Sequence, residues 1–127
     1  MEKIPVSATL KCAAGTAARV YFTPPLGVTW KLEEVYLTPN EAVATNGTDY
    51  VSINAYKGSS TSLATARVTS STGLTQGGVE ALTLADEENS TNREITRTSP
   101  LSVRVAHSGS GKLVDSVVTA VVSVKRV

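Results

Sequence analysis

Several short stretches of the sequence carry residue types that could do chemistry. Ser110-Gly111-Lys112 is similar to the end of a phosphate-binding loop. The full pattern, G-x-x-x-x-G-K-[ST], needs glycine at position 106 and a hydroxyl at position 113, where the chain has Ala106 and Leu113. The stretch also lies between two predicted strands and not before a helix, so we predict a flexible hairpin turn.

His107 is the only histidine of the chain, and Cys12 is its only cysteine. A catalytic or metal-binding histidine needs partners, and the sequence offers no second histidine and no obvious nucleophile. We interpret His107 as a strand-end residue whose ring is satisfied by a nearby loop. Cys12 cannot form an internal disulfide, and a small residue in a reducing compartment is a better interpretation of it than a reactive thiol.

Asp86-Glu87-Glu88-Asn89 is the densest acidic cluster. Oxygen-rich loops can hold calcium, and Asp49 or Asp115 could approach this one, but the Asp-x-Asp-x-Asp-Gly spacing is missing. We therefore predict a solvated loop. Glu33 and Glu34 are neighbours that point to opposite faces of a strand, so they cannot act as an acid/base pair. The sequence predicts no enzyme activity, no cofactor and no metal site.

Five aromatic side chains could form a sugar-stacking platform, because carbohydrate-binding modules use aromatic faces: Tyr21, Trp30, Tyr36, Tyr50 and Tyr56. Trp30, however, alternates in phase with Val28 and Leu32, which indicates a core tryptophan. Carbohydrate binding therefore stays as an alternative function.

Length and composition describe one folded domain. The chain has 127 residues, enough for one core, with 12 basic and 11 acidic side chains and a formal net charge of +1. No basic stripe indicates nucleic-acid binding, and no apolar run approaches the roughly 20 residues that span a bilayer. The N-terminus lacks the apolar core of a signal peptide, which predicts folding where the chain is made. We expect a single domain over residues 1–127 that binds neither nucleic acid nor membrane.

Apolar and polar residues alternate along most of the chain, and helical periodicity is missing. Eight or nine short strands, separated by glycine-rich turns, predict an all-β antiparallel sandwich or barrel. The alternation changes phase within residues 28–37, so we predict a β-bulge near Glu33-Glu34 that keeps both halves facing the core. The predicted core residues are Val20, Phe22, Trp30, Leu32, Val51, Ile53, Val103 and Val105.

The last predicted strand, residues 114–127, is apolar on both faces in its middle, at Val117, Val118, Val121 and Val122. A small sandwich normally leaves one face of each sheet in water. The pattern therefore indicates a central strand, or a strand with one face covered by another chain.

Residues 1–6 contain a proline and little that would anchor them. We predict that they form an N-terminal arm that orders on a partner. Together with the last strand, the arm predicts a partner interface that includes Ile4, Val6, Val117 and Val121.

Three patterns give the chain a family resemblance. "FTPPLGVTWKL" at residues 22–32 matches aromatic-T-x-P-x-G-x-x-(W/L)-x-(L/V), "VSINAY" at residues 51–56 matches (V/I)-x-(I/L)-x-(V/A)-Y, and "GSGKLV" at residues 109–114 matches G-x-G-x-x-(L/V). In this order they resemble a family of small jelly-roll virion proteins of tailed bacteriophages, which includes capsid decoration or cement proteins and head-fibre modules. The motifs are structural and carry no catalytic residue.

The resemblance implies a two-sheet antiparallel jelly-roll sandwich of about eight strands that assembles as a homotrimer on a capsid shell or fibre. The chain lacks the stalk of the fibre members, so a decoration module is the better match. We expect a non-enzymatic structural protein of the virion, made in the host cytoplasm, that binds the major capsid protein or another virion protein. The alternative is a carbohydrate-binding or host-adhesion module displayed on a virion or fibre.

Before the predicted strand that begins near residue 28, Pro24 and Pro25 fix φ and cannot donate to a β-ladder, and Gly27 permits an unusual backbone angle. We predict that these residues form a corner where the chain crosses between sheets. Trp30 is expected to seal the core beside it.

Overall fold

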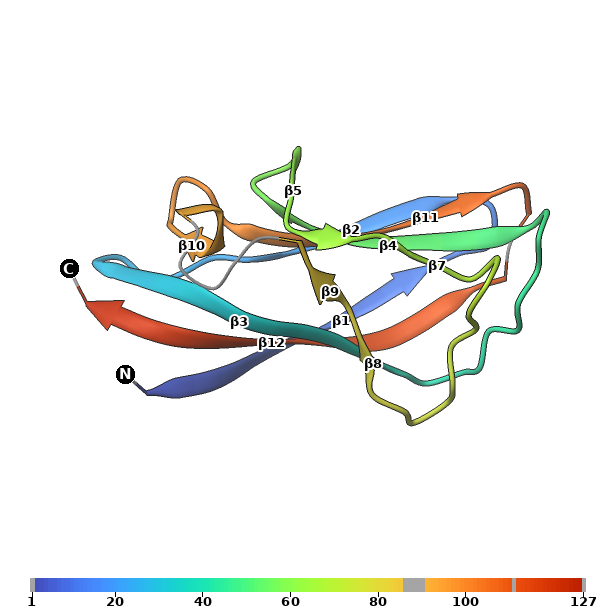
Figure 1. Cartoon of the computed structure of the whole chain (residues 1–127), viewed down its shortest axis with the longest axis horizontal. Coiled ribbons are helices and arrows are strands. Elements are labelled where there is room, and N and C mark those ends of the chain that lie inside the picture. Colours follow the sequence, from blue (N-terminus) through green and yellow to red (C-terminus); the bar gives the residue numbers. More distant parts are fainter. Residues whose placement is uncertain (1, 86–90, 111, 127) are drawn as a thin grey trace.

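A computed structural model describes residues 2–85, 91–110 and 112–126 of the chain. Figure 1 shows two layers of strands, with β2, β11 and β4 in one layer and β1, β12 and β3 in the other. The predicted all-β sandwich of antiparallel sheets is therefore confirmed. The acidic cluster at residues 86–89 lies outside the described residues.

The first sheet is built around its two longest strands, which pair with each other along most of their length. Its order is β1–β12–β3–β10, and β8 also pairs with β3. The strands are β1 (Lys3–Cys12), β12 (Val114–Arg126), β3 (Val28–Pro39), β10 (Glu94–Ile95) and β8 (Glu80–Ala81). The predicted central position of the last strand is confirmed, because β12 lies between β1 and β3.

The second sheet has the order β2–β11–β4–β5, and β7 also pairs with β4. Its strands are β2 (Ala17–Phe22), β11 (Leu101–Ser108), β4 (Tyr50–Lys57), β5 (Thr61–Ser62) and β7 (Arg67–Val68). The long strands alternate between the sheets along the chain, so β1 and β3 lie in the first sheet and β2 and β4 in the second. The connection from β11 to β12 likewise joins one sheet to the other. The predicted hairpin there is wrong, because its two strands pair with other partners.

One side of the sandwich is closed by a segment that crosses between the sheets. Strands β6 (Ala64–Thr65) and β9 (Thr83–Leu84) pair there, and Figure 1 shows β9 following β8 between the two layers. Arg67 and Glu80 form an ion pair across this side, and both side chains are largely buried. Residues 64–68 and 80–84 form only two-residue strands, because β6 and β7 pair with different neighbours, as do β8 and β9.

The predicted corner before β3 is confirmed, since β2 and β3 belong to different sheets. The amide of Val28 donates to the carbonyl of Pro25 at 3.1 Å, which closes a β-turn. Gly27 has φ +77°, the left-handed value that the third residue of a type II turn requires. Trp30 follows with 6% of its surface exposed, so it is a core residue as predicted.

The predicted β-bulge is also confirmed. Val121 of β12 pairs with Glu34, and the next residue, Val122, pairs with Leu32, so Glu33 is the extra residue. The hydroxyl of Ser123 donates to the Glu33 carboxylate at 2.8 Å. Because of the bulge, the core-facing residues of β3 have even numbers before Glu33 and odd numbers after it.

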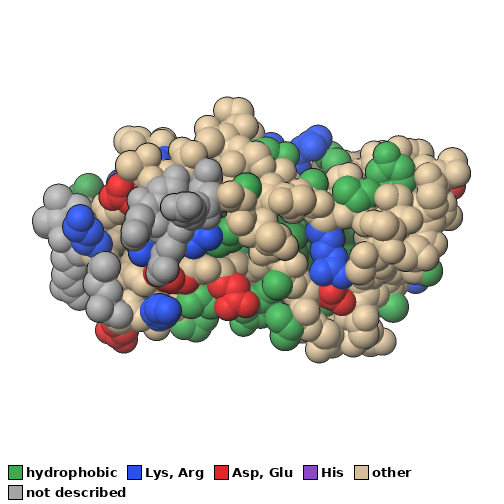
Figure 2. All heavy atoms as spheres, viewed as in Figure 1, with side chains coloured by type: hydrophobic (Ala, Val, Ile, Leu, Met, Phe, Trp, Pro, Cys, Tyr) green, Lys and Arg blue, Asp and Glu red, His purple; other side chains and the backbone are tan. Residues whose placement is uncertain are grey.

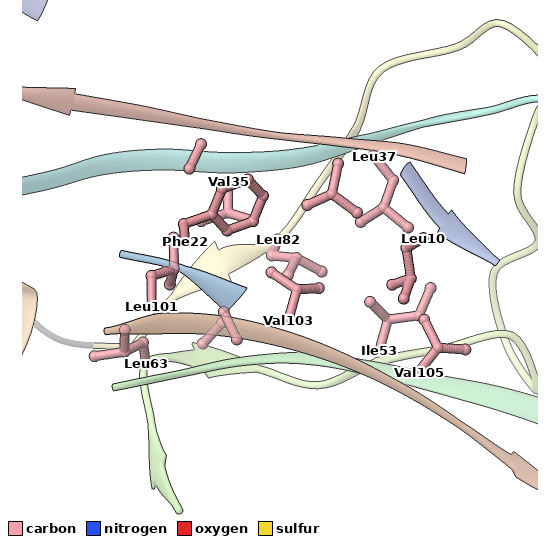
Figure 3. Close-up of a cluster of buried hydrophobic side chains, with 14 of the residues drawn as sticks. Leu10, Phe22, Val35, Leu37, Ile53, Leu63, Leu82, Leu101, Val103 and Val105 are labelled. Carbon is pink, nitrogen blue, oxygen red and sulfur yellow. The ribbon is translucent and has the colours of Figure 1, made fainter. Parts of the chain in front are cut away.

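The core lies between the two layers, as the side chains in Figure 3 show. Seven of the eight predicted core residues are buried, and Val20 is the exception because it is only half-buried. Val20 lies on β2, an edge strand of the second sheet, so it has a neighbouring strand on one side only. Leu63 and Leu82 complete the core from the crossing segment, a position that the alternation did not predict.

The predicted N-terminal arm is wrong for the described residues 3–6. They form the beginning of β1, where Lys3 to Val6 pair with Ser123 to Ala120 of β12. A proline is tolerated there because β1 is an edge strand. Backbone pairing with β12 therefore holds this segment, and Ile4 and Val6 also pack against the core.

Deletion of the bulge residue, compared with deletion of a residue beyond it, provides a test of the register. Deleting Glu33 removes the extra residue and leaves Leu32, Glu34 and Val35 in regular alternation, so we expect a loss of only about 1–2 kcal/mol from the Ser123 hydrogen bond. Deleting Tyr36 instead turns Leu37 out of the core, and we expect a loss of about 3 kcal/mol or more. Urea unfolding of both variants measures the difference, and equal losses would contradict the assigned register.

Candidate functional site

Strand β12 gives the first sheet two apolar faces. Val118, Ala120 and Val122 point into the core and are fully buried. Val117 and Val121 alternate with them, point to the opposite face and are half-buried. Two of the four predicted interface residues therefore lie together on the outside of the sandwich.

The two valines lie in three adjacent rows of paired residues. We call the nine residues of these rows the outer valine face. The rows run across β1, β12 and β3. They consist of Pro5, Val121 and Glu34; Ser7, Thr119 and Tyr36; and Thr9, Val117 and Thr38. Thr119 in the centre is only 6% exposed, and its hydroxyl lies 3.0 Å from that of Ser7. The centre of this face is thus poorly accessible to water although no third layer covers it.

Charged groups lie mostly at the ends of the outer valine face. Lys3 approaches Glu33 at 3.9 Å at one end, and Asn40 donates to Asp115 at 3.1 Å at the other. Within the three rows Glu34 is the one ionisable acid. A partner could therefore cover Val117 and Val121 without removing several charges from water, which would be costly.

Ile4 and Val6, the other two predicted interface residues, lie on the opposite face of the first sheet. They pair with Val122 and Ala120, which face the core. With Trp30 and other residues they line a groove of about 620 Å³. The four predicted residues therefore do not form one surface, because residues of even and odd number on a regular strand point to opposite faces.

The five aromatic side chains do not form one platform. Trp30 is buried in the core, and Tyr36 lies on the outer valine face. Tyr21, Tyr50 and Tyr56 occupy outward positions of the second sheet. Figure 2 shows the side of the molecule between these outer faces, where hydrophobic side chains appear in small separate groups.

Cys12 and His107 come together in the structure, a pairing that sequence reasoning missed. The sulfur of Cys12 lies 3.6 Å from Nδ1 of His107. The two residues are 95 positions apart. They meet because the turn that follows β1 lies against the end of β11, where the amide of His107 donates to the Thr16 carbonyl. A thiol beside an imidazole is the arrangement that thiol nucleophiles use.

The thiol of this pair is enclosed by the part of the chain that the structure describes. Cys12 is 1% exposed, and its sulfur is surrounded by the oxygens of Ala13, Thr16 and Val105. The His107 ring is held on both sides, with Nδ1 2.9 Å from the Thr16 carbonyl and Nε2 against the Lys112 carbonyl. The interpretation of His107 as a strand-end residue satisfied by a nearby loop is confirmed.

The described ranges hold neither a cluster of metal-ligating side chains nor a helix that could span a membrane. No three His, Cys, Asp or Glu side chains there lie close enough together to hold a metal ion. The helix in these ranges is a three-residue 3-10 turn, η1 (Thr91–Arg93), and no helix there is long and apolar enough to cross a membrane.

Comparisons of the chain with family models, with curated proteins and with solved structures found no match. What can be proposed about its function therefore depends on the sequence patterns and on the surfaces described above.

The buried environment of Cys12 predicts its reactivity. In the folded protein we expect no reaction with a thiol reagent such as dithionitrobenzoate over minutes, because the reagent needs an accessible thiolate. In 6 M guanidinium one thiol per chain should react at once, which serves as the control. Rapid reaction of the native protein would show that Cys12 and His107 are an accessible pair and would reopen the question of catalysis.

Proposed function

We propose that the chain is a non-enzymatic structural subunit of a phage virion, of the capsid decoration type. It assembles as a homotrimer and docks on the major capsid protein or another virion protein. Three features support this proposal: the family resemblance of the sequence patterns, the order of the strands, and the outer valine face.

The strand order supports a jelly roll in particular. The long strands pair as β1–β12–β3 in one sheet and β2–β11–β4 in the other, and short strands extend each sheet beyond β3 and β4. First and last strands are thus neighbours, as are the second strand and the one before the last. Two sheets wound in this way, with the connections β1–β2, β2–β3, β3–β4 and β11–β12 crossing between them, are expected of a double-sheet jelly roll.

The observation that carries the proposal of self-association is the outer valine face. Outward positions of an antiparallel sheet are normally polar, yet β12 places two valines and a threonine there. Burial of such a patch against a second subunit would remove its apolar surface from water, at about 25 cal/mol per Å². The number of subunits comes from the family resemblance alone.

A carbohydrate-binding or adhesion module is the alternative. It needs exposed aromatic rings on one groove or flat face. Tyr21 is 53% exposed, but Trp30 is buried and Tyr36 lies on the other sheet. This distribution favours the structural proposal.

Substitution of Val121 tests the assembly. We expect the wild-type protein to have about three times the 13.2 kDa mass of one chain by light scattering at micromolar concentration. The variant Val121→Glu should be monomeric, because the buried interface would then hold an uncompensated charge. Leu26→Glu is the matched control, since Leu26 is 83% exposed and lies in the turn before β3, outside the three rows of this face.

Circular dichroism should show the same strand spectrum for all three proteins. A wild-type protein that is monomeric at micromolar concentration would contradict the trimer. Mass spectrometry of particles released by cells that encode the chain tests the virion assignment, which fails if the chain is missing from purified particles.

A further inference from the structure

The outward face of the second sheet has a different chemistry from the outer valine face. It displays two tyrosines and two arginines close together on β2, β11 and β4. Two adjacent rows of paired residues hold them. The rows are Tyr21, Ser102 and Tyr56, followed by Arg19, Arg104 and Asn54, and we call these six residues the tyrosine–arginine face.

The two arginines lie directly opposite each other on neighbouring strands. Directly paired residues have Cβ atoms about 4.5–5.5 Å apart, and like charges in such a pair are destabilising. The outward residues of the three strands include no acid that could offset them. They are Ala17, Arg19, Tyr21, Tyr50, Ser52, Asn54, Tyr56, Ser102, Arg104, Ala106 and Ser108.

Arg19 is held in place by neutral groups. Its guanidinium donates to the Ser102 hydroxyl at 2.9 Å and to the Ser59 carbonyl at 3.1 Å. It also lies over the ring of Tyr56, 4.9 Å from the centroid. Ser102 in turn donates to the Gly58 carbonyl at 2.7 Å. The positive charge of Arg19 is therefore fixed in position but not neutralised.

Arg104 differs from Arg19, because its half-buried side chain makes no hydrogen bond or ion pair with the part of the chain that the structure describes. Its neighbour Tyr21 is 53% exposed. A fixed cation, a free cation and an exposed aromatic ring thus lie side by side on a flat surface.

We propose that the tyrosine–arginine face docks on an acidic surface of another protein, with Asp or Glu carboxylates between Arg19 and Arg104. Arg binds carboxylates through two parallel hydrogen bonds, and Tyr and Arg are enriched among the residues that dominate protein interfaces. This inference rests on the proposed function in one respect, that the chain docks on a larger protein.

A second copy of this chain fits the face poorly. Its outer valine face has the single acid Glu34 within its rows, and the bordering Glu33 already approaches Lys3. An acidic glycan fits less well than a protein, because stacking of sugars needs open aromatic rings. One face of the Tyr56 ring is covered by Arg19, which leaves Tyr21 as the exposed ring of this face.

The test uses the full chain and fluorescently labelled poly-L-glutamate as an acidic polypeptide probe, with binding measured by anisotropy at low and at 150 mM salt. We expect Arg104→Gln to weaken binding about tenfold at low salt and to leave the fold unchanged by circular dichroism. Lys125→Gln is the matched control, since it removes one positive charge from an exposed position of the other sheet. It should change binding less than twofold. Tyr21→Ala should weaken binding without any change in charge.

Three outcomes would overturn the proposal. The first is that the wild type does not bind polyglutamate, and the second is that Arg104→Gln and Lys125→Gln weaken binding equally. The third is that the chain binds polygalacturonate through Arg104 and does not bind polyglutamate. The last outcome would assign the face to an acidic glycan. Arg104-dependent binding of polyglutamate by a chain that is missing from virions would support the docking face and contradict the virion assignment, so the two failures are distinguishable.

Discussion

Strand β12 pairs with β1 along one side and with β3 along the other, over nearly all of its thirteen residues. Every side chain on it is therefore committed to one of two faces. Val118, Ala120 and Val122 supply the core, while Val117 and Val121 are left on the outside. The pairing with β12 also sets the register of β1 and of β3. The first sheet therefore depends on the hydrogen-bond ladders that β12 forms with these two strands.

The bulge at Glu33 follows from that constraint. β3 places Leu32 and Val35 in the core, and these positions have opposite parity in the sequence. A regular ladder against β12 would turn one of them outward, at a cost of about 1.5–3 kcal/mol for a large apolar side chain. Glu33, as one unpaired residue, removes the conflict. The Ser123 hydroxyl donates a hydrogen bond to its carboxylate.

The two outer faces of the sandwich are chemically different, and both proposals depend on this difference. One face is nearly neutral and rich in β-branched side chains, and the other carries Arg19 and Arg104 without an acid on its strands. Sheet faces that served only the fold would be expected to mix charges of both signs. Two distinct faces suit a subunit that meets its own copies on one side and a different protein on the other.

The sequence by itself determined the fold class, the corner at Pro25 and Gly27, the bulge near Glu33 and the core position of Trp30, because alternation and turn chemistry are local properties of a strand. It could not determine which strands pair. The N-terminal segment was predicted as an arm and is paired with β12. The connection from β11 to β12 was predicted as a hairpin and joins two sheets, and the predicted interface residues divide between two faces. The meeting of Cys12 with His107, and of Arg19 with Arg104, likewise depends on pairing between distant segments. Only the tertiary structure decided these contacts, since side chains far apart in sequence become neighbours only when long-range ladders form.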